Sequence, residues 1–239
     1  MNAGIECAFV YTSGETRTNI KIIDETTRIC TELNEAGPPA SLADAQKLEQ
    51  TLSRITGKGD VVIFSGSVPD GLPEDVYARL IFGAKKSGAK TVLDADGLAL
   101  SEGLRADPDA VKPNVGELSR LTGRQVCTPE EVAEVVLETG LSRGRRVLVS
   151  RGADGAMMFR DDSVLIADPS KVPVVSTVGA GDAMTAAVAI GLLEDMSNEE
   201  ILKKACAYAA ATVMSEHFEH LTAETVGKLQ ADIRLRYFQ

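Results

Sequence analysis

The segment Thr177-Val178-Gly179-Ala180-Gly181-Asp182 places small residues and one carboxylate where a helix is expected to begin. The small residues Gly179, Ala180 and Gly181 let the backbone approach a ligand, and the free N–H groups of a helix N-terminus bind anions. A carboxylate beside such a turn would repel a phosphate that was only bound, so Asp182 needs another role. Taking a proton from an attacking hydroxyl is one such role, and it indicates phosphoryl transfer. The alternative is that Asp182 only complements the helix dipole.

Two other phosphate-binding motifs do not fit the chain. A P-loop requires Gly-Lys followed by Ser or Thr, but the two Gly-Lys pairs continue as Gly57-Lys58-Gly59 and Gly227-Lys228-Leu229. The dinucleotide-binding fingerprint requires Gly or Ala at the position that Met184 occupies. The glycine turn at Gly179 therefore belongs to neither class.

The composition favours an enzyme that acts on small molecules. The 239 residues include 25 basic and 35 acidic side chains, which give a net charge of -10, whereas proteins that bind nucleic acids present basic surfaces. No apolar run approaches the length of a membrane span, and no basic signal segment opens the chain, so we expect a cytoplasmic protein with no membrane partner.

The few cysteines and histidines argue against a metal centre built from them. The four cysteines form no C-x-x-C pair, so we expect free thiols. His217 and His220 are the only histidines, and they lie close together near an expected helix end. A histidine-based metal site and a Ser/His/Asp hydrolase are both disfavoured.

The pattern of elements divides the chain in two. Residues 1–38 carry short β-type stretches at 8–11, 18–23 and 28–31, which predict a small antiparallel sheet. Residues 39–239 alternate strands with helices, which predicts an α/β fold with a mainly parallel sheet flanked by helices. The expected strands are 61–64, 90–94, 146–150, 157–160, 163–166 and 173–175, and the expected helices are 41–55, 73–86, 129–139, 181–193, 198–215 and 222–235. Ligands of such sheets bind at the carboxyl ends of the strands.

Four ordered segments resemble the motifs of the ribokinase-like (PfkB) carbohydrate kinases. The segment 177–182 resembles the family signature. Lys112-Pro113-Asn114-Val115-Gly116-Glu117-Leu118 is similar to the K-P-N-x-x-E-L element, Ser150–Ala156 to the S-x-G-x-x-G nucleotide loop, and Ser65–Gly71 to the S-G-S-x-P-x-G turn. Residues 14–21 and 31–35 narrow the resemblance to the branch that holds 1-phosphofructokinase and tagatose-6-phosphate kinase.

The resemblance implies Rossmann-type layers with an N-terminal antiparallel β lid. It also implies transfer of the γ-phosphoryl group of ATP, with Mg²⁺, to a hydroxyl of a hexose phosphate of the fructose 1-phosphate or tagatose 6-phosphate type. Asp182 would be the base, and the N–H groups of Gly179, Ala180 and Gly181 would stabilise the charge on the transferred group, as in an oxyanion hole.

The same resemblance assigns the nucleotide site. Lys112 would face the ATP phosphates, and Asn114 and Glu117 would lie near the Mg²⁺ and act through water. For Glu117 the alternative is an exposed residue of a capped helix. The loop residues expected to wrap the nucleotide are Ser150, Gly152, Ala153, Asp154 and Gly155.

The sugar phosphate would meet the N-terminal β segment. Arg17 is the candidate for its phosphate group, with Ser65 and Lys21, because an arginine fork matches phosphate oxygens. The alternative is a solvated Arg17 on an exposed β-ribbon. The lid strands of the family often pair between subunits, so a homodimer through residues 1–38 is expected.

The beginning of the sequence departs from the family pattern. Members usually carry, before the element that matches residues 14–21, a first core strand, a sugar-binding aspartate and a G-G-x-x-x-N turn. We therefore expect low activity or association with a second chain. The alternatives are a kinase of an unphosphorylated sugar or nucleoside, and a nucleotide-binding truncated form without activity.

Overall fold

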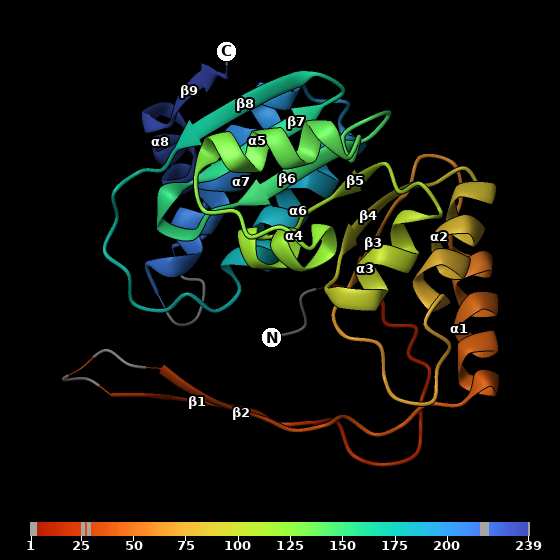
Figure 1. Ribbon diagram of the computed structural model, residues 1–239. Helices are drawn as coiled ribbons and strands as arrows, with labels where there is room; N and C mark the ends of the chain where they lie inside the picture. Colours follow the sequence, from red (N-terminus) through yellow and green to blue (C-terminus); the bar gives the residue numbers. More distant parts are fainter. Residues whose placement is uncertain (1–3, 25–26, 28–29, 216–219, 239) are drawn as a thin grey trace.

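The computed structural model describes residues 4–24, 27, 30–215 and 220–238, and every structural statement below refers to them. A mixed sheet lies between two helical layers, and a two-stranded ribbon extends away from this α/β core (Figure 1). The α/β fold predicted from the sequence is confirmed. Within the described part of the chain, no helix is long and apolar enough to cross a membrane.

The central sheet has its parallel strands on one side and its antiparallel strands on the other. The order is β3-β4-β5-β6-β7-β8-β9 among the described residues. The pairs from β3 to β6 are parallel and those from β6 to β9 are antiparallel. The bounds are β3 Val61–Ser65, β4 Lys90–Asp94, β5 Ala110–Val111, β6 Arg146–Ser150, β7 Ala156–Arg160, β8 Ser163–Asp168 and β9 Arg234–Tyr237.

Each face of the sheet is buried under its own set of helices. Successive side chains of a strand point to opposite faces, so Val147 and Val149 belong to one apolar cluster and Leu148 to the other. The first cluster packs α1 Leu42–Ile55, α2 Val76–Lys86, α3 Gly97–Leu104, α4 Val115–Thr122 and α5 Pro129–Glu138. The second packs α6 Ala180–Leu193, α7 Asn198–Val213 and α8 Ala223–Asp232.

The predicted helix starts agree with local capping chemistry. Ser41 begins α1 in a capping box with Asp44, and Ser197 begins α7 in one with Glu200. Thr128 and Glu131 form the same reciprocal pair at α5, with Pro129 in the first turn. Such pairs satisfy N–H groups that a helix start leaves free, which is why the sequence alone predicts them.

Two of the expected strands are wrong. Residues 8–11 and 173–175 have no regular secondary structure, because a strand needs a pairing partner. The N–H group of Val175 instead donates to the carbonyl oxygen of Val213 at the end of α7 (2.8 Å).

Helix boundaries also differ from the expectation. The helix expected from residue 73 starts at Val76, and the one expected to run to residue 235 ends at Asp232, before β9. Sequence analysis missed α3, β5 and β9, and it raised α4 only in the alternative for Glu117, since short elements have too few residues to show a period. The helix expected to run to residue 215 ends at Val213, and His217 lies outside the described residues. Cys7, Cys127 and Cys206 are free thiols, as expected, and burial raises the pKa of Cys206 to about 12.

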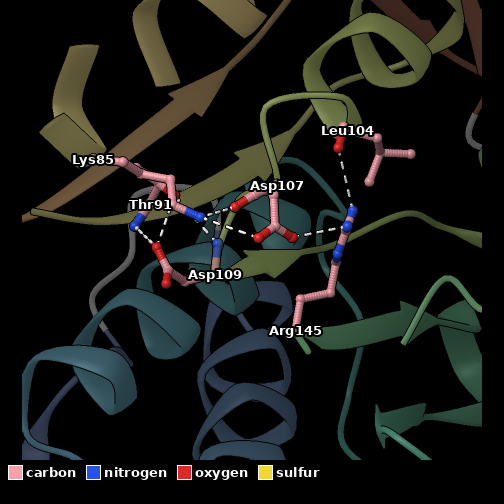
Figure 2. A network of polar contacts seen from close by, with 6 residues as sticks. All are labelled: Lys85, Thr91, Leu104, Asp107, Asp109 and Arg145. Atoms are coloured by element: carbon pink, nitrogen blue, oxygen red, sulfur yellow. Dashed lines mark hydrogen bonds and ion pairs between the residues drawn. The ribbon is translucent and has the colours of Figure 1, made fainter. Parts of the chain in front are cut away.

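A polar network fixes the segment that leads into the two-residue strand β5 (Figure 2). Asp107 has a left-handed φ of 54°. Its carboxylate forms ion pairs with Arg145 (2.9 Å) and with Lys85, and its carbonyl oxygen accepts a hydrogen bond from Lys85. Asp109 accepts from the N–H group (2.8 Å) and the hydroxyl (2.9 Å) of Thr91 at the start of β4. These side chains gather at the amino ends of the strands, so they hold β5 in register without occupying the opposite, carboxyl edge.

The N-terminal ribbon is a sheet of its own. Its strands β1 Asn19–Ile23 and β2 Cys30–Asn34 pair antiparallel, with Ile20 opposite Leu33. The predicted small antiparallel sheet is therefore confirmed. The division of the chain at residue 38 stays a prediction.

Candidate active site

The carboxyl ends of the parallel strands carry four polar residues at one edge of the sheet. Ser65 ends β3, Asp94 ends β4, Lys112 follows β5 and Ser150 ends β6. The register places Ser65 beside Asp94, and the N–H group of Lys112 donates to the carbonyl oxygen of Leu93 (3.0 Å). This is the edge at which open α/β sheets bind their ligands.

The signature segment forms the start of α6, as its small residues predict. Gly179 is the N-cap with a left-handed φ of 80°, and Asp182 lies in the first turn. Among the described residues no side chain caps this helix, whereas α1, α4, α5 and α7 have capping boxes. In the described chain the N–H groups of Gly179 and Gly181 have no acceptor, whereas that of Ala180 donates a long bond to the carbonyl oxygen of Thr177 (3.4 Å). The helix dipole favours an anion at this turn.

A cavity of about 580 Å³ joins three of the predicted site residues. Ser65, Glu117 and Asp182 all line it. The rest of its wall comes from the turn after β3, from the segment after β4 and from the start of α3, with the lining residues Gly66–Leu72, Glu74, Asp94–Asp96, Leu98 and Ala99. The cavity therefore opens at the carboxyl edge of the sheet, beside the N-terminus of α6.

Two contacts hold the turn after β3 in place. The hydroxyl of Tyr77 in α2 donates to the carbonyl oxygens of Ser65 (2.8 Å) and Gly66 (3.1 Å). Gly71 has a φ of 86°, and a Cβ there would come within 2.5 Å of the carbonyl oxygen of Ala40. Burial raises the pKa of Tyr77, and the nearby Asp94 charge adds to this. Sequence analysis missed Tyr77, because an aromatic residue early in a helix carries no distinctive signal.

Lys112 is buried behind this cavity and paired with Asp94. Its Nζ lies 3.1 Å from Oδ1 of Asp94, and Oδ2 of Asp94 accepts from the hydroxyl of Thr185 (2.6 Å). Sequence analysis missed both partners of this network. The position of Asp94 at the end of a predicted strand could have found it, whereas a threonine inside a helix gives no signal.

Asn114 and Glu117 cap each other at the start of α4. Oε2 of Glu117 accepts from the N–H group of Asn114 (2.8 Å), Oε1 accepts from Nδ2 of Asn114 (2.7 Å), and Oδ1 of Asn114 accepts from the N–H group of Glu117 (2.9 Å). Glu117 thus belongs to a helix cap, but its side chain is partly buried and not exposed as the alternative expects. A further role stays open because a carboxylate oxygen has more than one lone pair.

The surroundings of Glu117 disfavour its charged form. Burial raises the pKa of Glu117 and the charges of Asp94 and Asp96 add to this, against the bond from Asn114 and the charge of Lys112. The opposite holds for Asp96, whose pKa is lowered first by hydrogen bonds from the guanidinium of Arg120 at 3.0 and 2.8 Å.

The donors at this site suit a magnesium ion held through water. Asn114 and Glu117 supply the hard oxygen atoms that Mg²⁺ prefers. In the described part of the chain, no three acidic, histidine or cysteine side chains lie close enough together to hold a metal ion directly. Mg²⁺ usually keeps several waters and binds substrate phosphates, so this spacing fits the ion.

The expected nucleotide loop follows β6 as a short 3₁₀ turn over Gly152–Asp154. Gly152, Ala153 and Asp154 are exposed. Gly155 has a φ of 85°, and a Cβ there would lie 2.2 Å from the carbonyl oxygen of Ala167, so only glycine fits. Ser150 pairs with Asn114 in an isolated parallel bridge, which joins this loop to the start of α4. Within the described chain, this loop does not line the cavity.

The two predicted substrate-phosphate residues of the ribbon differ in their contacts. Nη1 of Arg17 donates to Oγ of Ser67 in the cavity wall (2.7 Å). Lys21 lies in the middle of β1, across from Glu32, and is not among the described residues that line the cavity. The structure thus brings Arg17 into contact with one residue of the cavity wall, although Arg17 itself is not among the lining residues, and leaves Lys21 on the ribbon.

Known proteins are similar to this chain in sequence and in fold. A 1-phosphofructokinase of Rhodobacter capsulatus is 42% identical over 174 residues, which are 72% of this chain and 55% of that protein. The alignment thus spans little more than half of that relative.

Solved structures of phosphofructokinase-2 from Escherichia coli are also similar. Its tetrameric inhibited form is 29% identical with a TM-score of 0.83 and covers 95% of this chain and 74% of that one. Its complex with fructose-6-phosphate is 28% identical with a TM-score of 0.76 and covers 89% and 69%.

The family itself follows from a match that covers most of the chain. Residues 1–221 match the pfkB family carbohydrate kinase domain, which includes all four motifs found in the sequence. The chain therefore belongs to the pfkB family of carbohydrate kinases.

Proposed function

We propose that this protein transfers the γ-phosphoryl group of ATP to a hydroxyl of a hexose phosphate. One observation carries the proposal: Asp182, in the first turn of the uncapped helix α6, shares a cavity with Ser65 and Glu117 at the carboxyl edge of the sheet. A base, an anion-binding turn and a set of hard oxygen donors are then next to one another. These are the parts that phosphoryl transfer requires, since its catalysis is mostly positioning and charge stabilisation.

Asp182 is the proposed base. Its carboxylate would take the proton of the attacking hydroxyl as that oxygen bonds to the γ-phosphorus and the bond to the β-phosphate oxygen breaks, which releases ADP. The N–H groups of Gly179, Ala180 and Gly181 would stabilise the charge on the transferred group. A well-placed donor of this kind contributes about 3 kcal/mol to transition-state stabilisation.

The nucleotide would lie across the ends of β5 and β6. We assign Lys112 to its phosphates, and Ser150, Gly152, Ala153, Asp154 and Gly155 to the loop around it. Asn114 and Glu117 would hold waters of a Mg²⁺ ion. When bound, this ion would neutralise charge on the ATP phosphates.

The second substrate is proposed to carry a phosphate group of its own. Arg17 reaches the cavity wall at Ser67, and with Ser65 it would bind that phosphate, whereas Lys21 on the ribbon is left out of this assignment. The similarity to a 1-phosphofructokinase, and to a phosphofructokinase-2 crystallised with fructose-6-phosphate, supports a fructose 1-phosphate or tagatose 6-phosphate type of substrate.

We also propose a homodimer formed through the ribbon. Ile20, Ile22 and Leu33 are each about half exposed, and the antiparallel register puts them on one face of the β1–β2 sheet. An apolar face on a two-stranded ribbon is seldom left in water. A related phosphofructokinase-2 forms a tetramer, which supports assembly in this family. The cytoplasmic location stays a prediction.

A coupled ATPase assay with fructose 1-phosphate, tagatose 6-phosphate and fructose 6-phosphate tests the activity. Asp182→Asn should lower kcat at least about a hundredfold with little change in ATP affinity, because the amide cannot accept the proton. Asp162→Asn, on the exposed turn between β7 and β8, is the matched control and should be silent.

Two other results would redirect the proposal. Wild-type turnover by Asp182→Asn would show that this residue is not the base. Calorimetry that finds ATP binding with no turnover on any sugar would favour the nucleotide-binding form without activity, and turnover only on unphosphorylated sugars or nucleosides would favour the other alternative.

A further inference from the structure

The side chain of Lys112 is unusual because it is charged and yet almost completely buried. Its side chain is 5% exposed, and that of its partner Asp94 is 12% exposed. A buried ammonium is costly unless an anion and hydrogen bonds compensate for the lost hydration. The ion pair of 3.1 Å supplies that anion, from the strand directly beside β5.

Thr185 completes the network from the opposite helical layer. Its hydroxyl lies 2.6 Å from Oδ2 of Asp94 and 3.1 Å from the carbonyl oxygen of Gly181. A hydroxyl has one proton to donate, and hydrogen bonds to a charged acceptor are the stronger ones, so the proton goes to Asp94. The side chain of Asp94 is thereby fixed at both oxygens, one by Lys112 and one by Thr185.

The network ends beside the anion-binding turn. Nζ of Lys112 lies 3.7 Å from the place that a Cβ on Gly181 would occupy. An ammonium has three N–H donors, and Asp94 is the one ion-pair partner of Lys112 among the described residues. Donors thus remain on Lys112 at the side where the N–H groups of Gly179–Gly181 would hold a phosphate.

We propose that Asp94 and Thr185 are positioning residues that hold Lys112 against the Gly179–Gly181 turn, so that its ammonium meets a phosphate of the bound nucleotide. The inference rests on the proposed function, because it requires a nucleotide at this turn. The hydrogen bond of Thr185 connects α6 to β4, and the ion pair of Asp94 connects β4 to the end of β5. The hydroxyl of Thr185 would thus fix the distance between the Lys112 ammonium and the Gly179–Gly181 turn.

The test compares two buried threonines of the same helical layer. Thr185→Val removes the hydroxyl at nearly constant shape, and Thr185→Ser restores it. Thr212→Val is the matched control, because Thr212 in α7 is 1% exposed and its hydroxyl has no hydrogen-bond partner in the described chain. Calorimetry measures binding of ATP and of adenosine, and thermal unfolding checks the fold.

Thr185→Val should weaken ATP binding about tenfold, the size expected for one misplaced charge-assisted contact, and leave adenosine binding unchanged. Thr185→Ser should recover most of the loss, and Thr212→Val should bind both ligands like the wild type. Selectivity for the ligand with phosphates is decisive, since a general loss of structure would weaken both ligands together.

A second variant covers the case in which Thr185→Val does not fold. Asp94→Asn keeps the shape of the side chain and removes its charge, and it should show the same selective loss of ATP affinity. Equal loss for ATP and adenosine, or no loss for either, in a wild type that binds ATP would overturn this inference and leave the proposed function standing. A wild-type chain that binds no ATP would overturn both.

Discussion

The guanidinium of Arg17 donates a 2.7 Å hydrogen bond to the hydroxyl of Ser67, across fifty positions of sequence. The contact joins the N-terminal ribbon to the wall of the cavity that Asp182 lines. The segment just before the ribbon therefore brings a cation to the wall of a cavity that is rich in carboxylates. If Arg17 binds the phosphate group of the substrate, as we propose, a kinase of uncharged sugars would not need this contact.

Arg17→Ala should raise KM for the sugar phosphate about tenfold or more, because the variant loses one charge-assisted contact to the phosphate group. KM for ATP should not change. Arg17→Lys should fall between the two, because an ammonium cannot reproduce the guanidinium fork. Steady-state kinetics with each substrate varied in turn measures this. Arg105→Ala, at the exposed arginine that follows α3, serves as the control. An unchanged KM would favour an unphosphorylated substrate.

Two glutamates in equivalent capping boxes should respond to pH with opposite sign. Burial raises the pKa of Glu117, so the folded state binds its proton more tightly than the unfolded state does. This group therefore costs stability as pH rises through the ordinary glutamate pKa and beyond. Glu117→Gln keeps a side chain that can cap the helix. As pH rises from 4 to 7, the free energy of unfolding of this variant should increase relative to that of the wild type.

Glu131 provides the opposite case. Hydrogen bonds from the N–H groups of Thr128 and Cys127 lower its pKa, so it contributes stability above the ordinary pKa and loses it as pH falls. Glu131→Gln should thus be less stable than the wild type near pH 7, with a smaller difference near pH 4. Urea unfolding across this range measures both variants, and parallel trends would contradict the assigned causes.

Gly71→Ala should destabilise the protein more than Gly59→Ala. Both glycines have a positive φ, so each substitution carries a backbone cost of about 1–2 kcal/mol. Only at Gly71 would the new Cβ meet a backbone atom, the carbonyl oxygen of Ala40 at 2.5 Å, whereas nothing lies within 4 Å at Gly59. The difference in free energy of unfolding measures this contact, and equal losses would refute it.

Ile22→Lys should weaken the proposed dimer, because it places a charge in the apolar face of the ribbon. Asn19→Lys is the control, since alternate residues of β1 point to the opposite face. Gel filtration with light scattering over a range of protein concentrations measures the association. A wild type that stays monomeric throughout that range would remove the ribbon interface from the proposal.

The sequence alone determined the elements whose signals are local. The caps at Ser41, Thr128 and Ser197 and the turn before Asp182 depend on neighbouring residues, so their chemistry is visible in the printed order. The α/β alternation also placed Ser65 and Ser150 at the carboxyl ends of expected strands, whereas β5, which Lys112 follows, was not predicted. Capping could not tell whether Glu117 does more than close a helix.

Only the tertiary structure decided which distant residues meet. The pairing of Lys112 with Asp94, and of Asp94 with Thr185 ninety-one positions away, depends on the register of β4 against β5 and on how α6 crosses the sheet. The absence of a strand at residues 8–11 has the same origin, since a strand forms only where a partner edge is available. Local sequence specifies helix starts and turns, whereas burial of a lysine requires an anion that only packing can bring to it.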